Sequence, residues 1–282
     1  MRKHLTPLVS IWAIGFTIAG AQTPPPTYIP QTKFARGQNV VPSFDGWLRN
    51  SDGSFTMVFG YMNRNYEEEL AIPAGADNQV APGSGDQGQP TYFLPRRHAW
   101  VFRAKVPSDW GSRELVWTIT VNGRTEKAYG SLKSDEEITE RLIMTRGGLS
   151  PGLDDPNQPP SIAIAPVEGA TLARPVKLTA LVTDDGLPKP RAPKPLPAAE
   201  PGKAQTNTNI TPRLGLNVVW IQYRGPAKVT FDTTIPILVT DGKAVVNARF
   251  STAGTYVLRA TANDGELSTT SDITLHVNSG QP

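Results

Sequence analysis

Residues 253–277 read AGTYVLRATANDGELSTTSDITLHV, and this stretch carries the clearest structural pattern in the chain. Apolar and polar residues alternate around Tyr256 and again around Leu275. Between the two halves lies Asn263-Asp264-Gly265, whose residue types are typical of tight turns. Alternation with a period of two predicts strands that bury one face, and the turn joins them into a hairpin. The stretch therefore predicts antiparallel β-structure.

The same alternation recurs upstream, which extends the prediction to most of the chain. Further strands are predicted at residues 55–61, 100–106, 115–121, 176–182, 216–220 and 244–250. Asp52-Gly53 and Asn122-Gly123 are turn sequences that favour hairpins, whereas Pro73–Pro90 is predicted to be a long loop. Many short alternating strands with turns between them indicate an all-β protein. We expect two antiparallel β-sandwich domains in tandem, with a short helix or edge strand near the linker.

The first 21 residues have the features of a cleavable secretory signal. Arg2 and Lys3 are basic, residues 8–18 are mainly apolar, and Ala19-Gly20-Ala21 supplies the small residues that signal peptidase reads. A membrane anchor needs about 20 apolar residues, which is more than this segment has. We expect cleavage before Gln22, no membrane span after cleavage, and a periplasmic or extracellular location.

Composition shifts set the remaining boundaries. Residues 22–39 are predicted to be a Pro-rich flexible leader, 40–133 the first β-sandwich domain and 134–160 a short helix with a linker. Ser134 and Glu137 have the spacing of a capping box, which favours the helix over an extra edge strand. Residues 161–278 are predicted to be the second domain, with a disordered Pro-rich insertion at 187–212.

Charge and cysteine usage exclude several classes of function. The chain has no cysteine, so it has no disulfide, thiolate metal site or lipid attachment through cysteine. Once the signal is removed, the balance of charged side chains is about +1, since the full chain carries +3 and the signal holds Arg2 and Lys3. Such a small net charge does not indicate a nucleic-acid partner.

The second domain resembles an immunoglobulin-like module of the PKD or cadherin type. The resemblance rests on Trp220 and on the run Ala253–Leu258. It implies that Trp220 packs between the sheets and that Tyr256 forms a tyrosine corner. The first domain resembles an uncharacterised exported bacterial family through residues 59–65 and 93–97, and that resemblance implies no activity.

Aromatic residues divide into a predicted core and a candidate contact surface. Alternation places Trp100, Trp117 and Trp220 on core faces. The candidates for stacking against a ligand, above all a carbohydrate, are Trp47, Tyr92 and Trp110.

No catalytic arrangement is evident in the sequence. Outside the signal only His98 and His276 remain, one in each predicted domain, and no nucleophile-elbow motif accompanies them. We interpret both as ordinary surface or rim residues. The run Glu67–Glu69 is interpreted as a solvated edge opposite Arg96 and Arg97. We therefore expect a protein that is not an enzyme and that needs no cofactor.

Calcium is the one metal for which the sequence offers a candidate site. Asp184 and Asp185 follow one predicted strand, while Asn263 and Asp264 follow another, and both loops leave the same end of the sandwich. Carboxylate and amide oxygens on loops suit Ca²⁺. These residues are also turn formers in their own right. Both interpretations remain open at this point.

Two functions from different classes are compatible with the sequence. The favoured one is a non-catalytic module of the cell envelope that contacts an envelope protein or polysaccharide. The alternative is a carbohydrate-binding accessory component of an exported hydrolase system. An exposed row formed by Trp47, Tyr92 and Trp110 would favour the alternative.

Overall fold

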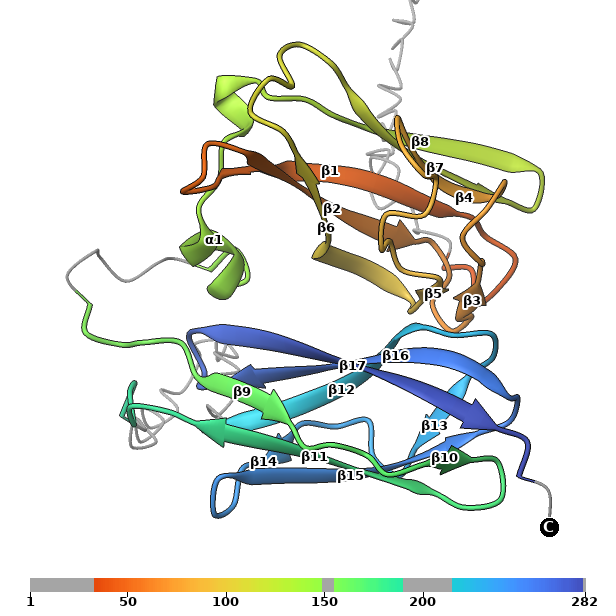
Figure 1. Cartoon of the computed structure of the whole chain (residues 1–282), viewed down its shortest axis with the longest axis vertical. Coiled ribbons are helices and arrows are strands. Elements are labelled where there is room, and N and C mark those ends of the chain that lie inside the picture. Colours follow the sequence, from red (N-terminus) through yellow and green to blue (C-terminus); the bar gives the residue numbers. More distant parts are fainter. Residues whose placement is uncertain (1–32, 149–154, 190–214, 281–282) are drawn as a thin grey trace, which may run out of the picture. The chain divides into compact units, whose positions relative to one another are not determined.

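The computed structural model describes residues 33–148, 155–189 and 215–280. Its C-terminal half is a sandwich of two sheets (Figure 1). The larger sheet has the order β10-β17-β16-β12-β14 and the smaller one β13-β15-β11-β9. All pairings are antiparallel except that of β10 with β17. The strands are β9 (Ser161–Ile164), β10 (Ala170–Thr171), β11 (Val176–Thr183), β12 (Asn217–Arg224), β13 (Val229–Phe231), β14 (Ile237–Leu238), β15 (Lys243–Phe250), β16 (Gly254–Asn263) and β17 (Ser268–Asn278).

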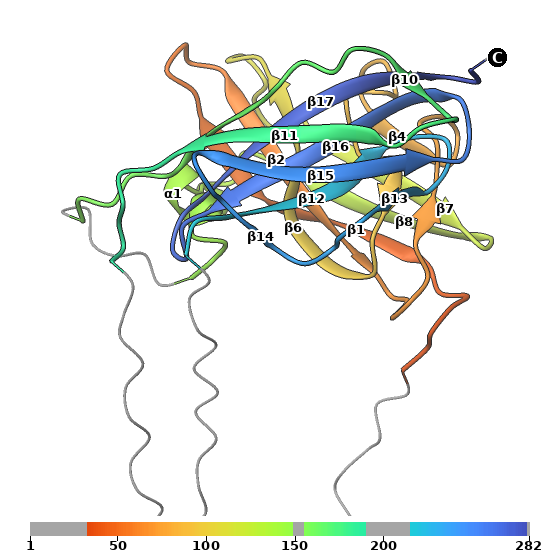
Figure 2. The same cartoon turned by 90° about the horizontal axis from the view of Figure 1, so that it is seen from below.

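Period-two patterning explains why these segments are strands. Along β15, exposed and buried residues alternate without exception, and β11 follows the same pattern except that Thr179 is half-buried. The two strands lie side by side in Figure 2, with Leu178 opposite Val246. Their buried side chains meet those of β12 and β16 in one apolar core, as a two-sheet sandwich requires.

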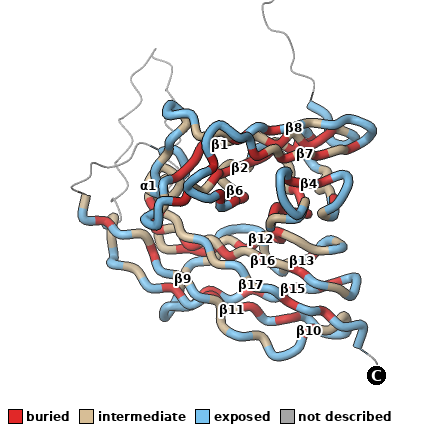
Figure 3. The backbone as a smooth tube through the Cα atoms, turned by 45° about the horizontal axis from the view of Figure 1, so that its top comes forward, coloured by how far each residue is buried: buried red, intermediate tan, exposed pale blue. Residues whose placement is uncertain are grey.

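The N-terminal half is a second all-β sandwich with its own core. One sheet has the order β1-β2-β6 and the other β4-β7-β8, and a small third sheet pairs β3 with β5. The strands are β1 (Val40–Arg49), β2 (Phe55–Asn63), β3 (Leu70–Ala71), β4 (Asn78–Ala81), β5 (Tyr92–Phe93), β6 (Arg96–Val106), β7 (Leu115–Val121) and β8 (Arg124–Gly130). The rings of Phe59, Phe102 and Trp117 contact one another at its centre. Figure 3 shows the buried residues gathered along these strands.

All three predicted hairpin turns are confirmed, and Asn263-Asp264-Gly265 joins β16 to β17 with Asn263 opposite Ser268. Asp52-Gly53 joins β1 to β2, and Asn122-Gly123 joins β7 to β8 with Val121 opposite Arg124. Asn122 and Gly123 have φ values of 52° and 73°. Positive φ at both central residues is the geometry of the type I′ turn, which Asn-Gly favours.

The predicted long loop Pro73–Pro90 contains a strand. β4 lies inside it and pairs with β7. Buried amides hold this segment in place, because Asn78 Nδ2 donates to the carbonyls of Ile72 and Pro90 while its Oδ1 accepts from Trp117 Nε1. Glycine and proline content alone did not reveal this network.

The segment after the first sandwich forms the expected short helix, but with a different cap. A 3₁₀ turn, η1, spans Ser134–Glu136 without a side-chain cap, and α1 spans Glu140–Met144. Thr139, rather than Ser134, caps the helix by accepting from Leu142 N. The capping-box prediction at Ser134 and Glu137 is therefore wrong, because Glu137 is extended.

Parts of the predicted leader and insertion lie outside the described residues, as does the signal. The exceptions are residues 33–39, which were assigned to the leader, and residues 187–189 of the insertion. Gln38 N donates to Asn65 Oδ1, and the buried Asn39 donates to Glu126 Oε1. These bonds make residues 38 and 39 part of the first sandwich.

Within the described residues, neither α1 nor η1 has the length and hydropathy that a membrane-crossing helix would need.

Candidate functional site

The three aromatic residues proposed as a ligand platform are buried. Trp47 is 3% exposed, Tyr92 5% and Trp110 6%. Each polar atom of these rings has an internal partner: Trp47 Nε1 donates to Lys133 O, Trp110 Nε1 to Arg113 O and the Tyr92 hydroxyl to Glu69 Oε2. The structure therefore contains no exposed row formed by these rings.

Trp100 departs from its predicted core position. Strand β6 is irregular there, with a register shift between the partners of Phe59 and Tyr61 on β2. Trp100 has a φ of 54°, its backbone N–H donates to Asp45 Oδ2, and its side chain is only half-buried. Strict alternation fails at Trp100, because the bulge disturbs the phase of the strand there, whereas Phe102, Ala104 and Val106 beyond it are buried as predicted.

Trp117, Trp220 and Tyr256 occupy the cores of the two sandwiches. They are 0%, 4% and 0% exposed. The Tyr256 hydroxyl donates to the carbonyl of Thr252, 2.8 Å away, which is the bond that defines a tyrosine corner. With Trp220 among the buried residues between the sheets, the C-terminal sandwich is immunoglobulin-like in architecture.

The histidines have ordinary partners. His98 Nε2 contacts the carbonyl of Pro95, and its ring stacks on Tyr61 with centroids 5.0 Å apart. Burial lowers the pKa of His98, and the positive charges of Arg146 and Arg97 act in the same direction. His276 is exposed and contacts the Thr255 hydroxyl. His98 is half-buried against Tyr61, which fits the rim position among the two that the sequence suggested.

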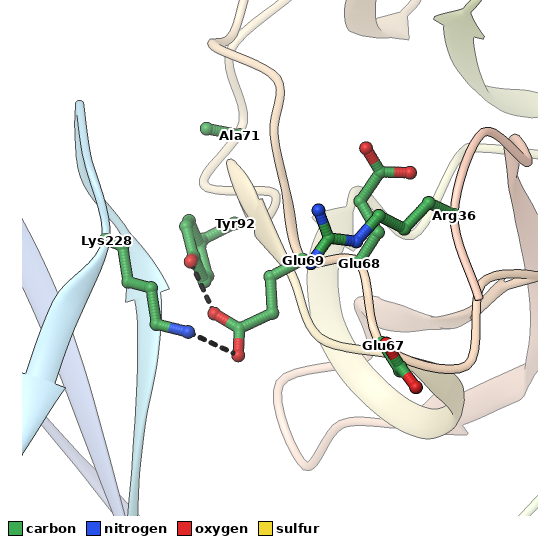
Figure 4. Close-up of a pocket in the computed structure, with 7 residues that line it drawn as sticks. All are labelled: Arg36, Glu67, Glu68, Glu69, Ala71, Tyr92 and Lys228. Atoms are coloured by element: carbon green, nitrogen blue, oxygen red, sulfur yellow. Dashed lines mark hydrogen bonds and ion pairs between the residues drawn. The ribbon is translucent and has the colours of Figure 1, made fainter.

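The acidic run Glu67–Glu69 lines a shallow polar pocket of about 390 Å³. Figure 4 shows the carboxylate of Glu69 between the Tyr92 hydroxyl and Lys228, whose Nζ lies 3.0 Å from Glu69 Oε1. The predicted opposing arginines have other partners, since Arg97 pairs with Asp45 and the Arg96 guanidinium covers the Tyr66 ring. The correct partner, Lys228, is distant in sequence and belongs to the other sandwich.

The four predicted calcium ligands divide into two groups. Asp185 accepts backbone N–H groups with both carboxylate oxygens, from Gln158 and Leu187. The Asn263 side chain bonds within its own turn, accepting from Gly265 N and donating to Leu267 O. These two residues are turn formers, as the second interpretation expected.

Asp184 and Asp264 are different, because each keeps one buried carboxylate oxygen without a hydrogen-bond partner among the described residues. Burial raises the pKa of Asp184, and the negative charges of Asp264 and Asp185 contribute to the same shift. Asp264 is 5% exposed. Within the described residues, no three His, Asp or Glu side chains come together as a metal-binding group.

Sequence reasoning missed the contact region between the sandwiches. The Tyr223 hydroxyl donates to Gly88 O, and Arg259 Nη1 donates to Val101 O. Arg224 also pairs with Asp86 at 2.7 Å. The described residues from Phe34 onward group into one compact unit through these contacts.

A signal for this contact was present in β12. Val219, Ile221 and Tyr223 make its outer face apolar, while Val218 and Trp220 make its inner face apolar. A strand with two apolar faces needs cover on both sides. The Tyr223 side of β12 therefore indicated that something packs against it.

No protein-family model matches this chain, and no curated protein sequence does so either. Similar solved structures include a conjugative transposon lipoprotein from Bacteroides eggerthii, which is 10% identical with a TM-score of 0.27 and matches 42% of this chain and 96% of that one. The D00-D0 domain of intimin is 10% identical with a TM-score of 0.26, covering 84% of this chain and 99% of that one.

A chimeric titin Z1Z2 tandem is 12% identical with a TM-score of 0.24, covering 84% of this chain and 93% of that one. With TM-scores this far below 0.5, these likenesses assign no family and no function to the chain.

Proposed function

We propose that the protein is an exported, non-catalytic β-sandwich module of the cell envelope that contacts an envelope protein or polysaccharide. The observation that carries the proposal is the fixed junction between the two sandwiches. Tyr223 is buried there, and Arg259 bridges from β16 to the carbonyl of Val101 on β6. A junction held by buried polar contacts keeps two surfaces in a constant relation, which lowers the ordering cost when both engage one partner.

Local chemistry agrees with a role in binding rather than catalysis. His98 and His276 face a backbone carbonyl and a threonine hydroxyl. Glu69 is engaged by Tyr92 and Lys228 at the edge of the polar pocket. These groups stabilise the fold instead of forming a nucleophile with its base.

The alternative, a carbohydrate-binding accessory component, has weaker support. Sugar recognition through stacking needs exposed flat rings, and Trp47, Tyr92 and Trp110 are buried. The aromatic rings that are exposed among the described residues are Phe34, Tyr66 and Tyr129, and the Tyr66 ring is covered by Arg96.

Export is tested by expressing the full chain in a bacterial host and separating cytoplasm, periplasm, membranes and medium. The expected product lies outside the cytoplasm and begins at Gln22 by mass spectrometry. Recovery of an unprocessed chain with residues 1–21 in the membrane pellet would contradict the proposed location.

Contact with the envelope is tested by co-sedimentation of the purified protein with isolated cell envelopes. Protease-treated and periodate-treated envelopes distinguish the two partner classes, since the first loses protein ligands and the second loses polysaccharide ligands. We expect saturable binding that one of the treatments abolishes. Equal sedimentation with and without envelopes would contradict the contact role.

A further inference from the structure

Buried oxygen atoms without hydrogen-bond partners occur in three segments at one end of the C-terminal sandwich. They are Oδ1 of Asn157, Oδ1 of Asp184 and Oδ2 of Asp264, and none has a partner among the described residues. Asn157 is 1% exposed and Asp264 is 5% exposed. A buried polar atom that has lost water and gained no partner is costly, and more so when it is charged. Each of these atoms therefore calls for a ligand.

Strand pairing brings the three segments to the same end. Ser161 at the start of β9 pairs with Thr183 at the end of β11, so the residues before β9 run beside Asp184. The bond from Gln158 N to Asp185 Oδ2, 2.9 Å long, fixes that position directly next to Asn157. The unpartnered amide of Asn157 is thus held against the loop that carries Asp184.

Asp264 approaches from the opposite sheet. It follows Asn263, the last residue of β16, which pairs with Asn217 at the start of β12. This end of β12 is joined to the end of β11 through the turn before β15, because Val239 N donates to Leu216 O and Val182 N donates to Gly242 O. Among the ion pairs between described residues, none includes either aspartate. Two carboxylates and one amide therefore lie at the same end of the sandwich.

We propose that Asn157, Asp184 and Asp264 bind a calcium ion. Carboxylate and amide oxygens are the hard ligands that Ca²⁺ takes, and water or backbone carbonyls complete its six to eight positions. This set differs from the one suggested by the sequence, because both side-chain polar atoms of Asp185 and of Asn263 are engaged. Asp184 and Asp264 are each engaged through one oxygen only, which accepts backbone N–H groups of the same turn and leaves the other oxygen for the ion. With only two carboxylates, we expect a Kd of about 10⁻⁴–10⁻³ M, in the range of extracellular calcium modules.

Binding would fasten the chain that enters the second sandwich. Asp155 Oδ1 accepts from Asn157 N, so the segment before β9 is already folded around Asn157. A cation shared with Asp184 and Asp264 would link this segment to both sheets at once. The proposed consequence is a calcium-dependent stiffening where the second sandwich begins, which goes beyond the contact function proposed above.

The test is a calorimetric titration of the purified, chelator-treated protein with CaCl₂ and, separately, with MgCl₂. We expect saturable Ca²⁺ binding and weaker binding of Mg²⁺, which demands a stricter octahedral geometry. Hydrogen exchange of the Gln158 amide, read in parallel, should slow when Ca²⁺ is present. No heat of binding and no change in exchange up to 10 mM Ca²⁺, about ten times the weakest expected Kd, would overturn the proposal.

Variants identify the ligands. Asp184→Asn and Asp264→Asn keep the size of each side chain, and each should weaken Ca²⁺ binding at least tenfold. Asp241→Asn is the matched control, because Asp241 is exposed near the same end and its φ of 49° is tolerated by asparagine. Circular dichroism checks folding, and Asn157→Leu provides a third, uncharged test. Wild-type affinity in all three site variants would show that Ca²⁺ binds elsewhere and would overturn the assignment of these ligands.

Discussion

The guanidinium carbon of Arg259 lies 4.0 Å from the ring centroid of Tyr223, and both residues reach across to the other sandwich. Arg259 donates to Val101 O, and Tyr223 donates to Gly88 O. Asp272 accepts from two nitrogens of the same guanidinium, which fixes its orientation. A planar, bidentate cation stacked on a ring is a role that lysine cannot reproduce.

Arg259→Lys should therefore destabilise the protein. Lysine loses the two-point contact with Asp272 and the stacking on Tyr223, and we expect a loss of about 1–3 kcal/mol in the free energy of unfolding. Urea denaturation measures it. Arg249→Lys, at an exposed position on β15, is the control and should change stability by less than about 0.5 kcal/mol. Equal effects of the two substitutions would show that the junction contributes no more than an ordinary surface residue.

The buried hydroxyl of Tyr223 should make the folded protein less stable in alkaline solution. Burial raises the pKa of Tyr223 to about 12, although the charge of Arg259 acts in the opposite direction. The Tyr223 phenol loses its proton near pH 10 in the unfolded chain but only at higher pH in the folded protein. Its contribution to folding stability is therefore complete below pH 10 and is lost as the pH rises toward 12. The stability difference between wild type and Tyr223→Phe should fall by roughly 2–3 kcal/mol over that range.

Denaturant titrations at pH 9, 10, 11 and 12 supply this difference for both proteins. Because other tyrosines titrate in both proteins, their contributions cancel in the comparison. A difference that does not vary with pH would mean that the Tyr223 hydroxyl ionises as readily in the folded protein as in the unfolded chain.

Trp220 tests the core of the C-terminal sandwich. It is 4% exposed, and its Nε1 has no hydrogen-bond partner among the described residues. Trp220→Ala should cost about 3–5 kcal/mol through lost burial and a residual cavity. Trp220→Phe should cost distinctly less, because it keeps an aromatic ring and removes an unsatisfied donor. A loss below about 1 kcal/mol for alanine would mean that the indole is not packed between the sheets.

The lowered pKa of His98 should make the folded protein less stable in acidic solution. Burial lowers its pKa below the ordinary value of 6.5, and Arg146 and Arg97 reinforce this. The unfolded histidine therefore takes up a proton more readily, and stability declines as the pH falls below 6.5. His98→Phe keeps a ring against Tyr61 and removes the titration, so its stability should decline less between pH 7 and pH 5.

His276→Gln is the control for that experiment, since His276 is exposed on the final strand. It should retain the wild-type decline in stability. If His98→Phe and wild type lose stability in parallel, His98 is not responsible for the acid sensitivity.

Local patterns predicted the features that depend on neighbouring residues in the chain. Asn122-Gly123 forms its hairpin because these two residues tolerate positive φ without help from the rest of the fold. Tyr256 is buried because the alternation along β16 directs its side chain inward, and its hydroxyl forms the tyrosine corner with Thr252 O. The same reasoning failed at Trp100, where the bulge in β6 changes the phase of the strand.

The amino-acid sequence by itself determined the all-β class, the hairpins and the main core faces, because period-two burial and turn chemistry act over a few residues. Only the tertiary structure decided that Trp47 and Trp110 are buried and that Tyr223 meets Arg259. It alone also placed the unpartnered oxygens of Asn157, Asp184 and Asp264 at one end of a sandwich. These relations join residues far apart in the chain, and the strand order that brings them together is set by packing of whole sheets rather than by any local pattern.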